Sequence, residues 1–154
     1  MGCNTQPLGT LVHTILLPVI ALVVWTLVVL GWMVRVRAAA VKAKGIDIMN
    51  RRGGRGQDLE KLIEPAAAWP AHNYAHLVEQ PTLFYAVCLA LAFAGLGSGT
   101  AVWLAWAYVA LRVAHSFEQN IANRIRIRAT LFLLSSAVLA ALALLAGWRV
   151  VEAA

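Results

Sequence analysis

The stretch HLVEQPTLFYAVCLALAFAG, residues 76–95, places a histidine and a carboxylate at the head of a run that is otherwise almost entirely apolar. About 20 apolar residues are enough for a helix to cross the hydrocarbon core of a bilayer. A charge in such a helix is costly unless it has a partner or a function. The stretch therefore predicts a membrane-spanning helix that carries a functional carboxylate, Glu79, near one end.

The composition of the whole chain agrees with a membrane location. Of the 154 residues, 61% are hydrophobic and only 13% are charged, and the mean hydropathy is +0.73. A soluble domain carries about 25% charged residues. The length predicts one domain covering 1–154. We predict no secretory signal peptide, because the first apolar stretch is too long and ends in arginines.

Four apolar stretches predict an all-α fold, a membrane four-helix bundle. Strands are excluded because hydrophobicity nowhere alternates with a period of two for long, and because lipid accepts only helices or closed barrels. The expected helices cover about 8–37, 70–96, 100–120 and 125–149, and a basic loop covers about 38–66. The short turn GLGSGT, residues 95–100, makes the second and third helices antiparallel neighbours.

Lys and Arg gather in two of the connections. Segments 35–64 and 124–128 are rich in them, whereas the 95–100 turn holds no charge. Because basic connections stay in the cytoplasm, we expect both to be cytoplasmic and both termini to lie outside. This topology accounts for the net charge of +6 without a nucleic-acid partner. The run RRGGRG, residues 51–56, is interpreted as a solvated loop near anionic lipid headgroups.

The polar residues inside the expected spans follow helical spacing and lie near the cytoplasmic ends. They are His72, His76 and Glu79 in the second helix, Tyr108, Arg112, His115 and Gln119 in the third, and Arg124 and Arg128 in the fourth. We expect Glu79 to pair with Arg112, and the surplus positive charge to bind an anionic small molecule. The simpler alternative is an ion-pair lock with arginines that extend to the headgroups. The surrounding arginines disfavour a metal site.

Three motifs, in order along the chain, resemble the MAPEG proteins, the membrane-associated proteins of eicosanoid and glutathione metabolism. They are HLVEQPTLFYAVCLA at 76–90, AWAYVALRVAHS at 105–116 and NRIRIR at 123–128. The resemblance covers essentially the whole chain and is closest to the bacterial branch. It implies a bacterial inner-membrane protein that forms a homotrimer of four-helix chains. It also implies that glutathione binds between neighbouring subunits near the cytoplasmic face.

The resemblance also implies roles for single residues. Arg35 would bind a carboxylate of glutathione, Glu79 would bind its α-amino group, and Arg128 would be catalytic. A cation beside the thiol lowers its pKa, and the resulting thiolate is the nucleophile. The other expected glutathione-binding residues are His72, His76, Arg112, His115 and Gln119.

Several positions depart from the family pattern. His72 and His76 stand where the family has Arg and Asn, and Gln119 stands for a tyrosine. Ala129 and Phe132 replace residues that carry hydroxyls in specialised members. These changes disfavour prostaglandin or leukotriene synthesis.

Two function hypotheses follow from the residues and the resemblance. The first is a glutathione-dependent transferase, or peroxidase, that acts on lipophilic electrophiles or hydroperoxides entering from the membrane lipids. The second is a protein of the same fold that binds an anion or serves assembly without catalysis. A transporter is poorly supported, because the polar residues gather at one end.

Overall fold

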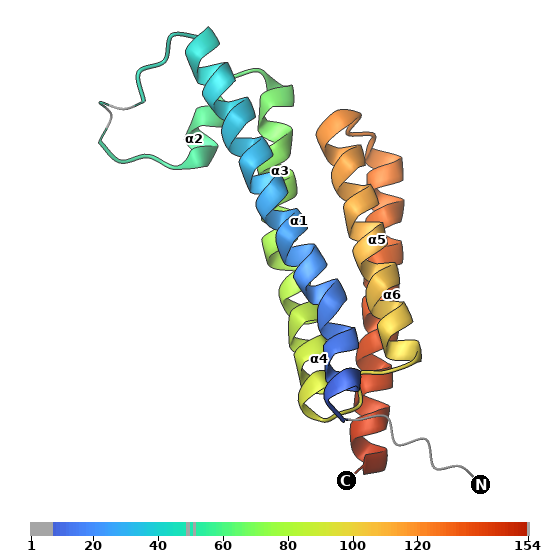
Figure 1. The fold of residues 1–154 in the computed structure, drawn as a ribbon. Coiled ribbons are helices and arrows are strands. Elements are labelled where there is room, and N and C mark those ends of the chain that lie inside the picture. The colour runs from blue at the N-terminus through green and yellow to red at the C-terminus, as the bar shows by residue number, and fades with distance from the viewer. Residues whose placement is uncertain (1–7, 49, 51, 154) are drawn as a thin grey trace, which may run out of the picture.

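The computed structural model describes residues 8–48, 50 and 52–153, with side chains from Thr14 onward, so Arg51 of the arginine–glycine run lies outside the described residues. In this part of the chain there are helices and no strands, which confirms the all-α prediction. The helices are α1 (Leu8–Ala43), α2 (Gly56–Glu60), α3 (Pro65–Glu79), α4 (Pro81–Phe93), α5 (Thr100–Ile121) and α6 (Ile125–Ala153). The long helices run side by side as an elongated bundle (Figure 1).

Among the residues that the structure describes, three helical stretches are long and apolar enough to cross a membrane, judged by length and composition. They are Thr14–Ala43 in α1, Pro65–Phe93 across α3 and α4, and Ile125–Ala153, which is α6. Large apolar side chains such as Leu27 and Leu133 are more than half exposed on these helices, at 59% and 67%. An extended apolar surface of this kind requires lipid or another protein as its neighbour.

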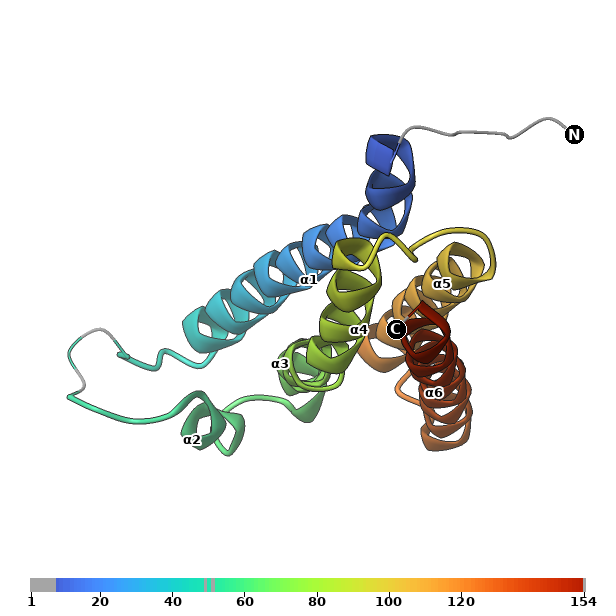
Figure 2. The same ribbon diagram turned by 90° about the horizontal axis from the view of Figure 1, so that it is seen from below.

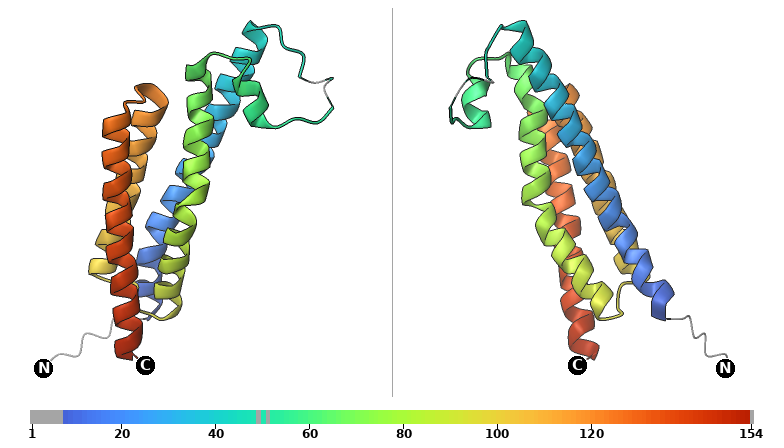
Figure 3. Two further views of the ribbon diagram at one scale, coloured as in Figure 1. Left: turned by 180° about the vertical axis from the view of Figure 1, so that it is seen from behind. Right: turned by 60° about the vertical axis from the view of Figure 1, so that its left-hand side comes forward.

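The helix expected over 70–96 is divided in two at Gln80, where α3 ends and α4 begins. Pro81 lacks a backbone N–H, so it interrupts the helical hydrogen bonds there, and the chain changes direction between the two helices (Figure 3). The Gln80 amide then connects to both neighbouring helices. It donates to Ser136 Oγ in α6 at 2.7 Å and accepts from the Tyr108 hydroxyl in α5 at 3.5 Å.

The apolar core is formed by side chains of α1, α3, α4, α5 and α6, and the end-on view shows how these helices are arranged (Figure 2). The rings of Phe84 and Tyr108 stack at its centre, with 4.6 Å between their centroids. Fully buried aliphatic side chains from the surrounding helices complete it: Ile15, Leu22, Val29, Leu91 and Leu142. Ile15, Leu22 and Val29 recur at intervals of seven along α1, which places these three on one helical face.

One end of the bundle is formed by the 94–99 turn and the last turns of α6 (Figure 1). A Cβ atom at Gly97 would lie 2.5 Å from Ile15 Cγ2, so only glycine fits against α1 there. Arg149 of α6 donates from Nη1 to the carbonyl oxygens of Leu96 and Ser98, at 2.6 and 3.0 Å. The turn carries no charge of its own, yet a guanidinium holds it closed.

The opposite end holds the segment that links α1 to α3 and the turn that links α5 to α6 (Figure 1). Glu60 of α2 is 3.2 Å from Arg37 Nη2 and 2.9 Å from His72 Nε2, so α2 is tied to both long helices. Lys44 donates to Glu64 at 2.7 Å, and this hydrogen bond holds the pKa of Glu64 below its ordinary value of 4.5. We call this the polar end.

Candidate functional site

A cavity of about 310 Å³ lies at the polar end, with walls from α3, α5 and α6. It brings together three of the residues that the sequence singled out, each from a different helix: His76 from α3, His115 from α5 and Arg128 from α6. Its other lining residues are almost entirely apolar: Ile125, Ala129, Phe132 and Leu133. The cavity therefore combines one permanent cation and two imidazoles with an apolar wall.

Phe132 is the centre of an aromatic cluster behind this cavity. The rings of His76 and His115 meet edge to face with 6.0 Å between their centroids, and each lies 6.3 Å from the Phe132 ring. The guanidinium carbon of Arg112 lies 5.9 Å from the same ring, within the range of a cation–π contact. Phe132 thus lies between Arg112 and the cavity and presents an apolar face to it.

Arg112 is fully buried, and its only described hydrogen bond goes from Nη2 to the backbone carbonyl oxygen of His76. Its Nε and Nη1 atoms have no partner among the described residues. Glu79 is not that partner, so the predicted ion pair between Glu79 and Arg112 is wrong for the single chain. Glu79 instead lies 3.8 Å from His76 Nδ1, and 68% of its side chain is exposed. The physical reason is that Arg112 meets the backbone of α3, whereas Glu79 faces outward.

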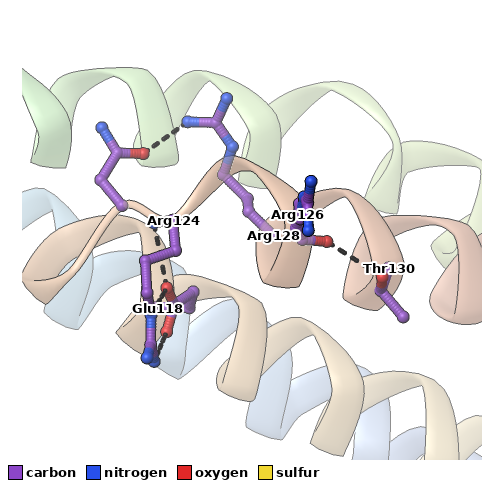
Figure 4. Close-up of polar contacts among 6 residues, drawn as sticks. Glu118, Arg124, Arg126, Arg128 and Thr130 are labelled. Atoms are coloured by element: carbon purple, nitrogen blue, oxygen red, sulfur yellow. Dashed lines mark hydrogen bonds and ion pairs between the residues drawn. The ribbon is translucent and has the colours of Figure 1, made fainter.

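Arg128 lies on the first turn of α6, where its guanidinium is held by a neighbouring side chain. Its Nη1 donates to Asn123 Oδ1 at 2.6 Å (Figure 4). Next to this bond, the Glu118 carboxylate accepts three bonds from Arg124: from the backbone N–H at 3.0 Å, and from Nε and Nη2 at 2.9 Å each. These bonds raise the pKa of Arg124. The α5–α6 turn is thus a compact polar unit beside the cavity.

Two expected site residues lie away from the cavity. Arg35 is exposed on α1, in an open groove of about 640 Å³ that it shares with Gly31 and Trp32. His72 lies in a separate groove of about 770 Å³ with Arg37 and Glu60. The single chain therefore does not bring Arg35 and His72 to the cavity that holds Arg128.

Gln119 is buried, and it belongs to a larger set of polar side chains inside the polar end. In the described part of the chain, buried side-chain atoms without a hydrogen-bond partner occur in Trp25 and Arg37 of α1 and in a group on α3 and α5: Asn73, Arg112, Ser116, Gln119 and Asn120. Asn73, Ser116 and Asn120 are not among the residues predicted from the sequence. Ser116 and Asn120 continue the polar face of Arg112 at intervals of four, so helical spacing could have identified them. For Asn73 there was no such signal.

Two further residues at this site were also missed, Gln80 and Asn123. Both have amide side chains and lie next to the end of a helix. The Gln80 amide donates to Ser136 in α6, and the Asn123 amide accepts from Arg128 in α6. Asn123 has a positive φ of 50°, a conformation that Asn tolerates better than most residues. An Asn that separates a helix from a run of arginines is a weak signal for such a turn.

The arrangement favours an anionic ligand over a cationic one. Arg128 and the buried Arg112 supply positive charge, and an apolar wall strengthens the field by excluding water. In the part of the chain that the structure describes, no group of three or more His, Cys, Asp or Glu side chains could hold a metal ion. The chemistry that fits is stabilisation of a negative charge at the edge of an apolar space.

Comparison with known proteins gives one match. The model of the MAPEG family matches residues 15–148, which is most of the chain. The comparison with curated proteins and the comparison with solved structures each found no match.

Proposed function

Because the chain belongs to the MAPEG family, whose members are membrane proteins of glutathione-related chemistry, we propose that it is a membrane glutathione transferase. Its substrates would be lipophilic electrophiles. A lipid hydroperoxide would be reduced to the alcohol and water by two glutathione molecules, which would be oxidised to the disulfide. The observation that carries the proposal is the cavity in which Arg128 meets an apolar wall. Arg128 keeps its charge at any working pH, so it is suited to stabilise a thiolate.

The proposed reaction is a nucleophilic substitution. Arg128 favours the thiolate over the thiol of bound glutathione by direct charge attraction. The sulfur then attacks an electrophilic carbon, a carbon–sulfur bond forms, and the leaving group departs with its electron pair. Ile125 and Leu133, which line the cavity and are 74% and 67% exposed, offer an apolar substrate a path from the bilayer.

The ends of the tripeptide need recognition groups of both signs. Glu79 offers a carboxylate for the α-amino group, and His76 beside it offers an imidazole. Arg35 would hold a carboxylate, but it lies in the groove on α1 and not in the Arg128 cavity. Support from the interior would come from Arg112, His115 and Gln119. His72 would contribute from the neighbouring groove, where it contacts Glu60.

We further propose that three copies of the chain assemble, so that Arg35 of one subunit completes the cavity of another. Two features support this. Glu79 is an exposed carboxylate within a helix suited to cross a membrane, where a charge is costly without a partner. The Arg35 groove contains Gly31, which leaves open space beside α1. Native mass spectrometry that found only monomers in a mild detergent would contradict the assembly.

We propose that the chain crosses the membrane four times, and the connections between the helices support this number. The chain leaves α4 at the 94–99 end and enters α6 at the polar end, so α5 must cover the same distance as the spans beside it (Figure 1). Its 22 residues rise about 33 Å, enough for a bilayer core of about 30 Å. We propose that the basic polar end is cytoplasmic and that both termini lie outside. Accessibility labelling of a cysteine introduced at Arg52 tests this orientation.

Replacing Arg128 tests the proposed chemistry. In Arg128→Ala the thiol pKa of bound glutathione should rise by about one unit or more, because each unit corresponds to only about 1.4 kcal/mol of charge stabilisation. The thiolate is measured by its ultraviolet absorbance during a pH titration, and turnover is measured with a chlorinated aromatic substrate. Both should fall, while glutathione affinity by calorimetry changes less because the groups at its ends remain.

A non-catalytic anion-binding protein is the second candidate. Ala129 and Phe132 line the cavity without hydroxyl groups, so a bound thiolate would lack those hydrogen-bond donors. This candidate is preferred if glutathione binds the wild type but neither thiolate absorbance nor turnover is detected, or if neither responds to Arg128→Ala.

A further inference from the structure

We propose that Asn123 is a positioning residue: its amide oxygen holds the Arg128 guanidinium at the cavity without neutralising it. The inference rests on the proposed function, because it assigns a role to Arg128. It concerns the turn between α5 and α6, where Figure 4 shows the bond between Asn123 and Arg128 and the bonds between Glu118 and Arg124. A backbone bond from the Asn123 N–H to the Glu118 carbonyl oxygen links the two.

The backbone of Asn123 is fixed by the end of α5. Its N–H donates to the carbonyl oxygen of Glu118 at 2.6 Å, and the N–H of Ala122 donates to the same oxygen at 3.1 Å. The φ angle of 50° lies in the left-handed region, which Asn and Gly adopt at low cost. Asn123 therefore places a short, polar side chain at a defined point beside the first turn of α6.

The turn is also fixed on the other side of Asn123. Glu118 binds both the backbone N–H and the guanidinium of Arg124, the next residue along the chain. A bidentate pair of this kind is among the stronger charge-assisted contacts. Rotation of the turn would break these bonds together, so the Asn123 amide is held between two anchored neighbours.

Arg124 and Arg128 bind acceptors of different charge at this turn. Glu118 is the carboxylate of this turn, and its oxygens are engaged by Arg124. Arg128 is bound instead by the neutral Asn123 amide, with 2.6 Å between Nη1 and Oδ1. An arginine side chain has many rotamers, and a single strong acceptor reduces them. A neutral acceptor does so while it leaves the positive charge available to an anion.

The test uses Asn123→Gly in the full-length protein, since glycine keeps the left-handed conformation and removes only the amide. We expect the thiol pKa of bound glutathione to rise and kcat/KM to fall by about tenfold, the effect of losing one hydrogen bond to a charged group. The KM for glutathione and the melting temperature should change little. The matched control is Arg126→Ala, which removes an exposed cation two residues from Arg128; among the described residues, the Asn123 side chain bonds to Arg128 and not to Arg126.

A double variant separates positioning from general damage to the turn. If Asn123 acts through Arg128, adding Asn123→Gly to Arg128→Ala should shift the thiol pKa no further. An equal shift in both backgrounds, or no shift from Asn123→Gly alone, overturns the inference while the proposed function stands. If the wild type forms no thiolate at all, the proposed function fails and the inference fails with it.

Discussion

The 94–99 turn and the polar end each contain a guanidinium group, partly exposed in Arg149 and fully buried in Arg112, and the two differ in how their hydrogen bonds are satisfied. Arg149 donates to two backbone carbonyl oxygens of the turn, those of Leu96 and Ser98. Arg112 has one described bond, to the carbonyl oxygen of His76, and two of its nitrogens have no partner in the described residues. Four amide and hydroxyl side chains at the polar end also contain buried polar atoms without a partner in the described residues: Asn73, Ser116, Gln119 and Asn120.

A buried polar atom without a partner costs about 1–3 kcal/mol. Several such atoms at one end would strongly lower the stability of a chain that functioned alone. The guanidinium at the 94–99 end therefore has hydrogen-bond acceptors within the chain, whereas the polar end contains buried polar atoms that have no partner among the described residues. Three variants, taken from the largest expected effect on stability to the smallest, test this difference.

The largest loss of stability is expected from Gly97→Val. The new side chain would start 2.5 Å from Ile15 Cγ2, so the turn and α1 must separate. Overpacking of this kind costs about 3 kcal/mol, measured by chemical unfolding in detergent micelles. Gly147→Val is the matched control, because a Cβ atom there meets nothing within 4 Å. Equal stability of the two variants would show that the turn is not packed tightly.

A loss of about 2 kcal/mol is expected from Arg149→Met, since hydrogen bonds to a charged group are each worth about 1.5–3 kcal/mol and this side chain is partly exposed. The methionine keeps much of the apolar volume but cannot donate to Leu96 or Ser98. Arg149→Lys should recover part of the loss, because an ammonium group can still donate. The same unfolding assay measures both variants.

The smallest change in stability is expected from Arg112→Met. Replacing a buried ionic group by an apolar side chain of similar size is often neutral or stabilising, so the ligand-free protein should unfold within about 1 kcal/mol of the wild type or above it. Glutathione binding and turnover should nevertheless fall, because the positive charge behind the cavity is lost. If Arg112→Met destabilises the ligand-free protein as much as Arg149→Met does, the contrast between the two ends is wrong.

Much of the architecture was predictable from local patterns. The lengths of the apolar runs indicated an all-α membrane protein, and intervals of three and four placed His76, His115 and Arg128 near one level. The structure brings these three to one cavity, while their chemical roles stay predictions. The division of the 70–96 helix at Gln80 was also readable in principle, because Pro81 follows it directly.

The partners of the polar groups could not be predicted in the same way. Glu79 and Arg112 were expected to pair because their charges and levels match, yet Arg112 meets the backbone of His76 and Glu79 faces outward. The sequence gives no measure of how far each helix is rotated about its axis. A shift of one residue turns a side chain by about 100°, which is enough to exchange an interior position for an exposed one.

The sequence by itself determined the class of the protein, the family to which it belongs and the end of the bundle at which its polar residues gather. These properties depend on hydrophobic run length, charge distribution and short motifs, all of which are local along the chain. Only the tertiary structure decided that Gln80 connects to Ser136, that Arg149 closes the 94–99 turn and that Asn123 holds Arg128. Such contacts depend on the rotation and offset of packed helices and on the geometry of single turns, and these are set by the packing of the whole bundle.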